Sequence, residues 1–106
     1  MPEDTAGCAI AGSPAVETFL AGRRAGVLTR AIHTLATCPL GSVAAEAHRL
    51  SGTLGVFGLE DSAALVRELE SLALASGTTA HGLSHQRAVT VVRLEAAARA
   101  TDAAPR

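Results

Sequence analysis

One histidine of the chain, His48, has neighbours that would leave its imidazole open to another molecule. Advancing about 100° per residue along a helix places His48 on the side away from the apolar stripe that contains Val43. The positions around His48 on that side all carry small side chains: Ala44, Ala45, Ser51, Gly52 and Gly55. Each glycine costs a helix interior up to about 1 kcal/mol, and a solvent face gives no packing reason for one. The pattern predicts a flat surface on which a second protein can approach the imidazole.

The chemistry that suits an isolated, exposed histidine is nucleophilic. Neutral imidazole is a competent nucleophile near neutral pH. Phosphoryl transfer needs chiefly in-line positioning and charge stabilisation, which a partner can supply with its own Mg²⁺ and carboxylates. His48 could therefore hold a phosphoryl group without having an active site of its own. Geometry alone also allows the plainer interpretation, a surface histidine with no role.

His48 belongs to the second of four predicted helices. Apolar residues at alternating spacings of four and three predict a helix over 42–57, with Ser42 as its N-cap. Ser-Pro at 13–14 predicts the start of the first helix. Gly22 and Gly26 predict a break or bend in that helix, with the arginines at 23–24 in a solvated turn.

Two further helices follow. Gly58 separates the second helix from a third apolar stripe over 63–73, and the composition of 76–82 predicts a loop. Ser84 is then expected to cap the last helix. The apolar stripe of this last helix is predicted to contain Ala88, Val89, Val92 and Ala96, with Arg93 and Arg99 near its C-terminal end. These elements predict an all-α fold, an antiparallel four-helix bundle with a short or bent N-terminal helix.

Length and composition exclude several other classes of protein. The 106 residues correspond to one domain, predicted as a tail over 1–12, a bundle over 13–101 and a C-terminal tail over 102–106. Nine basic and ten acidic residues argue against a protein that binds nucleic acid or a membrane surface through bulk charge. All nine basic residues are arginine, which suggests a GC-rich bacterial genome. An acidic N-terminus and the lack of a long apolar run predict a cytoplasmic protein, whose Cys8 and Cys38 are reduced thiols.

The segment from His48 to Gly58, HRLSGTLGVFG, resembles the signature of histidine-containing phosphotransfer (HPt) domains. That signature runs His-x-Leu-Lys-Gly, then five residues, then Gly, and His48, Leu50, Gly52 and Gly58 match it. Leu65, Glu68, Leu69 and Glu70 are similar to the Leu…Glu-Leu-Glu pattern of the family's next helix. The likeness spans roughly residues 14 to 100.

This resemblance implies a function and its partners. His48 would be the phosphorylated residue of a phosphocarrier in a bacterial two-component phosphorelay, exchanging phosphate with a response-regulator receiver domain, a histidine kinase or both. Ala44, Ala45 and Gly55 would lie in the partner-binding surface, and Ser51, Gly52 and Arg49 near the phosphoryl group. No cofactor is expected on the chain itself, because Mg²⁺ would belong to the receiver. No second catalytic group is expected beside His48, so the chain would not be an enzyme in its own right.

Ser51 departs from the family pattern, which commonly has lysine one turn after the histidine. A serine offers a hydrogen bond but no charge to the phosphoryl group, and we hypothesise that Arg49 partly substitutes for the lysine. Two alternatives follow: a pseudo-HPt adaptor that binds a receiver or kinase without phosphotransfer, or a helical oligomerisation module. His81 and His85 have a spacing that can bind metal on a helix, but Gly82 lies between them and no third ligand is evident, so no metal site is predicted.

Overall fold

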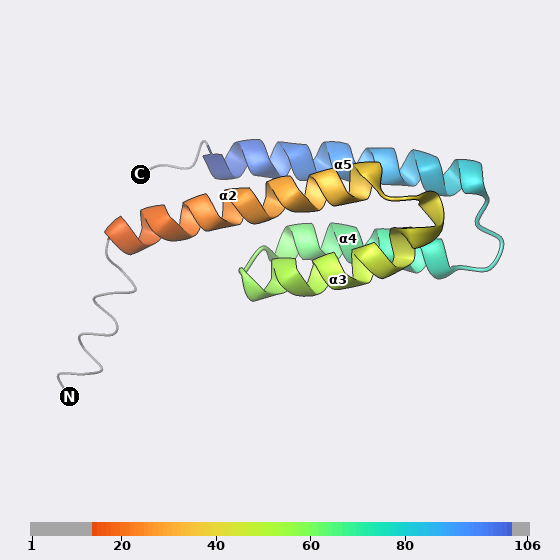
Figure 1. Ribbon diagram of the computed structural model, residues 1–106, viewed down its shortest axis with the longest axis horizontal. Helices are drawn as coiled ribbons and strands as arrows, with labels where there is room; N and C mark the ends of the chain where they lie inside the picture. Colours follow the sequence, from red (N-terminus) through yellow and green to blue (C-terminus); the bar gives the residue numbers. More distant parts are fainter. Residues whose placement is uncertain (1–13, 103–106) are drawn as a thin grey trace, which may run out of the picture.

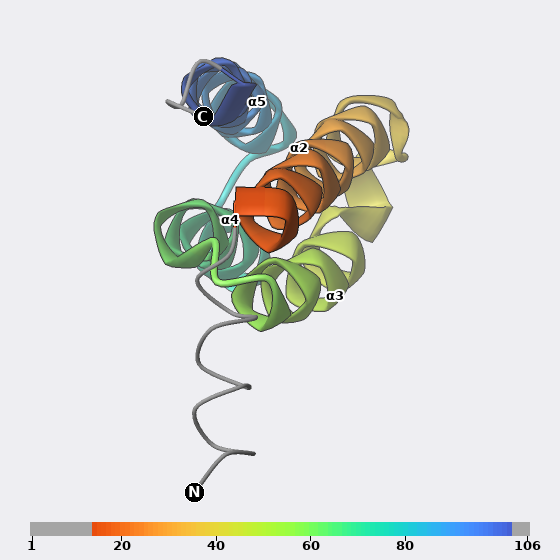
Figure 2. The ribbon, with the colours of Figure 1, turned by 90° about the vertical axis from the view of Figure 1, so that its left-hand side faces the viewer.

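The computed structural model describes residues 14–102, which form helices joined by short connections and contain no strand. In chain order these are α2 (Pro14–Thr37), the short 3-10 helix η1 (Leu40–Ser42), α3 (Val43–Val56), α4 (Glu60–Leu74) and α5 (Ala80–Asp102). Successive α-helices run in opposite directions, α2 lies beside α5, and α3 lies beside α4 (Figures 1 and 2). The all-helical prediction is confirmed for this part of the chain. The predicted tail over 1–12, which includes Cys8, and Ser13 at the predicted start of the first helix lie outside the described residues.

The prediction of a short or bent N-terminal helix is wrong in its first alternative, and α2 is not broken at its glycines. α2 is one helix of 24 residues that runs through both Gly22 and Gly26, so the arginines at 23–24 lie inside it and not in a turn. Neither glycine would bring a Cβ within 4 Å of other atoms. The cost of two glycines, about 1 kcal/mol each, is offset by tertiary packing, which supplies most helix stability in proteins. In α2 this packing buries the apolar residues Val27, Leu28, Ala31 and Leu35.

The core is made of small aliphatic side chains from all four helices. The predicted stripe of α3 is confirmed, since Val43, Ala47, Leu50 and Leu54 are buried and Phe57 packs against them. Ala63, Val66 and Leu69 are the buried apolar positions of α4. Phe19 does not join this core, because 65% of it is exposed. It lies in the N-terminal half of α2, which extends beyond the ends of α3 and α4 (Figure 1).

α5 differs from the prediction in its start and in its buried face. The helix begins at Ala80, and the hydroxyl of Thr79, not of Ser84, accepts a hydrogen bond from the Gly82 N–H at 2.9 Å, as an N-cap does. Leu94 and Thr90 are its buried residues, whereas Val92 is 58% exposed. Alanine and valine occur all around this helix, so the apolar pattern alone did not define one face.

A turn at the end of α3 and a side-chain contact between α5 and the end of α2 help to position the helices. Gly58 has φ of 75°, and hydrogen bonds from Gly58 N–H to Gly55 O and from Leu59 N–H to Leu54 O form a Schellman turn at the end of α3. At the other end of the molecule, Arg87 of α5 donates hydrogen bonds to the carbonyl oxygens of Leu35 and Cys38. Arg87 thereby satisfies carbonyl groups at the C-terminus of α2 that the helix itself leaves unpaired. Cys38 is half-buried and is a free thiol.

None of the helices in residues 14–102 combines the length and the apolar composition that crossing a lipid bilayer requires.

Candidate functional site

His48 lies on α3 with an imidazole that is 79% exposed, and one carboxylate lies beside it. The Nδ1 atom of His48 is 3.0 Å from Oε2 of Glu70, a residue of α4 whose side chain is only 20% exposed. An ionised carboxylate can only accept a hydrogen bond, so in the neutral ring Nδ1 carries the proton. The lone pair is then on Nε2, the nitrogen that does not contact Glu70. This contact between His48 and Glu70 was not predicted from the sequence.

The small residues predicted to surround His48 differ in exposure. Ala45 and Gly52 are exposed, whereas Ala44 and Gly55 are half-buried. A Cβ at Gly52 or Gly55 would meet no atom within 4 Å, so contacts within the chain do not require glycine at either position. Val56 is 84% exposed at the end of the same helix and was not predicted as part of this surface. Small side chains and one exposed valine together leave room for another molecule.

Ser51 does not belong to this open surface. It is 7% exposed, and its hydroxyl donates a hydrogen bond of 2.9 Å to the carbonyl oxygen of His48. The helical-wheel prediction failed because α4 covers the flank of α3 next to the apolar stripe, and that cover is wider than the stripe itself. Ser51 is therefore engaged within its own helix and does not present a free hydroxyl beside the imidazole.

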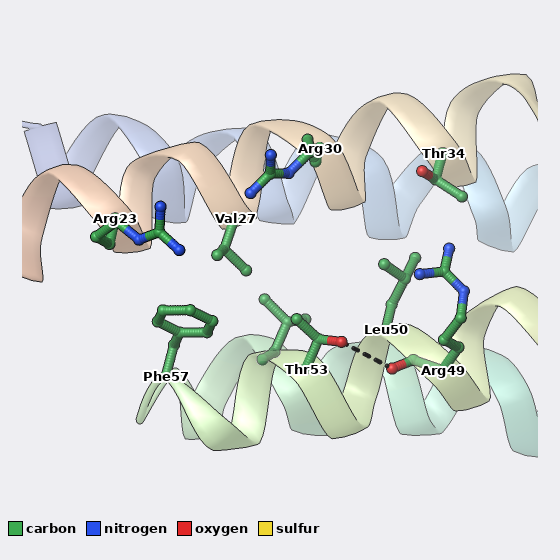
Figure 3. Close-up of a pocket in the computed structure, with 9 residues that line it drawn as sticks. Arg23, Val27, Arg30, Thr34, Arg49, Leu50, Thr53 and Phe57 are labelled. Atoms are coloured by element: carbon green, nitrogen blue, oxygen red, sulfur yellow. Dashed lines mark hydrogen bonds between the residues drawn. The ribbon is translucent and has the colours of Figure 1, made fainter.

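Arg49 lies on the other flank of α3. Its Nη2 and Nε atoms donate hydrogen bonds to Oε1 of Glu46 at 2.6 and 3.2 Å, and its side chain extends toward Thr34 of α2 (Figure 3). Glu70, by contrast, approaches His48 from α4. The structure therefore does not bring the Arg49 guanidinium to the imidazole, and the expectation that it replaces the family lysine is not supported by its position.

A different arginine, Arg67, is placed on the His48 side by the pairing of α3 with α4. The two helices run in opposite directions, and His48 contacts Glu70. Moving three residues along each helix from this contact places Ser51 level with Arg67. Arg67 is exposed and has no ion-pair partner among the described residues. A cation at the level of Ser51 could have been found from the sequence only if the alignment of the two helices had been known.

Comparison of the chain with protein-family models, with curated proteins and with solved structures finds no match. Within residues 14–102, no group of three or more His, Cys, Asp or Glu side chains could hold a metal ion. His33, His81 and His85 are exposed, like His48, but have no carboxylate partner in this part of the chain. His48 is distinguished from them by its contact with Glu70.

Proposed function

We propose that the chain is a phosphocarrier of the HPt type, in which His48 accepts and donates a phosphoryl group. The observation that carries this proposal is the contact between His48 and Glu70, which leaves Nε2 as the free nucleophile on an exposed ring. In this proposal the four helices form an antiparallel bundle, and the protein acts in the cytoplasm of a bacterium. Its partners are a receiver domain, a histidine kinase or both, and neither nucleic acid nor a membrane takes part.

The proposed step begins with a phosphorylated aspartate of the receiver. The Nε2 lone pair of His48 attacks phosphorus, the N–P bond forms, and the P–O bond to aspartate breaks, leaving a carboxylate beside the receiver's Mg²⁺. No proton moves, because Nδ1 keeps its hydrogen. Positive charge develops on the ring during the attack, and the Glu70 carboxylate, 3.0 Å from Nδ1, stabilises it. The reverse step returns the phosphoryl group to a receiver aspartate.

The open surface beside His48 supports the same proposal. A receiver must bring its aspartate in line with Nε2, which requires close approach of two protein surfaces. Ala45 and Gly52 present little side-chain bulk there, and Val56 offers an apolar contact. Since nothing within the chain requires glycine at 52, its cost to the helix is consistent with a role in binding.

A second candidate function, an adaptor that binds a receiver or kinase without phosphotransfer, is favoured by Ser51. Its hydroxyl is bonded to the His48 carbonyl, so it provides neither charge nor a free donor to a phosphoryl group. The same surface could also serve a helical oligomerisation module. Both alternatives predict that no phosphohistidine forms at His48.

In the deciding experiment, the full chain is mixed with a donor that carries a labelled phosphoryl group, and transfer of the label to the chain is measured. Phosphorylated receiver domains or an autophosphorylating kinase should transfer a label that is labile in acid and stable in alkali, and His48→Gln should abolish it. A second arm uses phosphoramidate, a small donor, with the label mapped by mass spectrometry. His33, His81 and His85 then serve as internal controls, because they are exposed but have no carboxylate partner among the described residues. Binding of a receiver without any label on His48 would favour the adaptor.

A further inference from the structure

A groove between α2 and α3 carries a concentration of positive charge that the phosphocarrier function does not use. It lies on the α2 side of α3, whereas Glu70 approaches His48 from α4. Its volume is about 210 Å³. The lining residues come from both helices and include Arg23, Val27, Arg30, Thr34, Arg49 and Phe57 (Figure 3).

The polar side chains that line the groove all belong to arginine and threonine, and no carboxylate lines it. Arg49 is partly neutralised by Glu46. Arg23 and Arg30 have no carboxylate partner among the described residues. Guanidinium groups have no acceptor and favour oxyanions. The groove is therefore suited to an anion that carries at least two negative charges.

The positions of the arginines indicate an elongated ligand. Arg23, Val27 and Arg30 are spaced by four and three residues, so they share one face of α2. Arg23 and Arg30 are about 10 Å apart along the helix axis, a separation that one phosphate or one carboxylate does not span. The Arg23 guanidinium lies over the Phe57 ring, 5.9 Å from its centroid, which holds this cation at the groove. Arg49 and Thr34 lie at the opposite end (Figure 3).

The small volume limits what such an elongated anion can be. Sites for drug-sized ligands usually have volumes of about 300–1,000 Å³, and this groove is smaller. An acidic peptide long enough to reach both ends would carry more bulk than the groove holds. We propose that the groove binds a linear polyphosphate group, with phosphate oxygens on Arg23, Arg30 and Arg49. Its source is either free inorganic polyphosphate or the phosphate chain of a nucleotide.

This site goes beyond the phosphocarrier proposal and is tested separately from it. Neither His48 nor Glu70 lines the groove, and no covalent step is involved. His48→Gln should therefore leave anion binding unchanged, even if His48 turns out not to be phosphorylated.

The test titrates inorganic tripolyphosphate into the full chain and follows binding by calorimetry and by amide chemical shifts. At low ionic strength, where exposed charges are poorly screened, we expect saturable one-to-one binding with a dissociation constant of about 1 mM or lower. Arg23→Ala and Arg30→Ala should each weaken binding about threefold to tenfold, as for loss of a charge-assisted hydrogen bond at an exposed site. Arg93→Ala is the matched control, because Arg93 is exposed on α5 and does not line the groove. It should change binding less than about twofold.

Further ligands distinguish the sources. Equal affinity for tripolyphosphate and ATP would support recognition of the phosphate chain itself, and tighter binding of one of the two would identify the free anion or the nucleotide as the source. The proposal is overturned by absence of saturation, by equal affinity for citrate, or by an Arg93→Ala effect as large as that of Arg30→Ala. Circular dichroism of each variant checks that the helices are intact.

Discussion

The Nδ1 atom of His48 and the Oε2 atom of Glu70 lie 3.0 Å apart, although the two residues belong to different helices. The imidazole is 79% exposed, whereas the carboxylate is 20% exposed. A partly sheltered acid thus holds one nitrogen of a ring that is otherwise open to solvent. This arrangement selects the tautomer and the orientation of His48 while leaving Nε2 accessible.

Replacing Glu70 by alanine should slow phosphorylation of His48 by about tenfold. Removing the group that fixes a histidine tautomer costs about 10⁴-fold in an enclosed catalytic triad. The loss should be much smaller here, because water can reach the exposed ring and take over the hydrogen bond. Initial rates of labelling measure the effect. Glu70→Gln should fall in between, since its carbonyl oxygen can accept the same hydrogen bond without the charge.

Glu68 provides the control for that experiment. It is an exposed carboxylate of α4 with no contact to His48. Glu68→Ala should leave the rate within about twofold of the wild-type value, because exposed charges at a distance are screened by salt. Equal effects at positions 68 and 70 would show that only the net charge of α4 matters.

Replacing Arg67 by alanine should lower the amount of phosphohistidine formed at equilibrium by about threefold to tenfold. Arg67 is level with Ser51 across the α3–α4 interface, so it can supply the charge that the serine lacks, and the expected loss corresponds to a net hydrogen-bond contribution of about 0.7–1.4 kcal/mol at an exposed site. Intact-mass measurement of the phosphorylated fraction tests this. Arg49→Ala is the comparison, because its guanidinium is bonded to Glu46 on the other flank of α3. A larger loss with Arg49→Ala than with Arg67→Ala would contradict the assignment.

Larger side chains at position 52 should leave the fold stable but slow phosphotransfer. Gly52→Ala should raise the free energy of unfolding by about 0.5–1 kcal/mol, since the position is helical and open. Gly52→Leu should fold as well but slow transfer from a receiver, because its side chain projects into the approach path. Gly22→Leu is the matched variant: Gly22 is also helical and exposed, and a Cβ there would likewise meet no other atom within 4 Å, but it lies on α2. Urea denaturation should show that both leucine variants fold, whereas the transfer rate should fall only for Gly52→Leu.

Replacing Arg87 by alanine should lower the free energy of unfolding by about 1–2 kcal/mol. The half-buried guanidinium donates to two carbonyl oxygens at the end of α2, and it also carries the sign of charge that a helix C-terminus favours. Urea denaturation followed by circular dichroism measures the loss. Arg93→Ala, on the exposed side of the same helix, should change the value by less than about 0.5 kcal/mol. An equally small effect of Arg87→Ala would show that these hydrogen bonds do not stabilise the fold.

Local patterns predicted much of this fold. The alternating spacings of four and three residues identified the buried face of α3, and Gly58 was correctly placed at its end. α2 was harder, because the cost of its two glycines is local whereas the packing that offsets it comes from other helices. The face of α5 was predicted wrongly because alanine and valine surround the helix, and Leu94 and Thr90 became its buried positions.

The candidate site was predicted only where it depends on one helix. The exposure of His48 and Gly52 follows from the periodicity of α3 and agrees with the structure. Glu70 belonged to a recognised pattern, yet its contact with His48 depends on how far α4 is shifted along α3. Ser51 was misplaced for the same reason, since a helical wheel does not show where a neighbouring helix lies.

The Schellman turn at Gly58 determines which residue of α4 lies beside His48. It joins α3 directly to α4, so it determines which residues of the two helices meet farther along the pair. One residue inserted into α4 between that turn and Glu70 would shift Glu70 by about 1.5 Å along the helix and rotate it by about 100°, and the carboxylate would no longer face Nδ1. The position of the Glu70 carboxylate beside the imidazole is therefore set at a turn that no partner needs to touch.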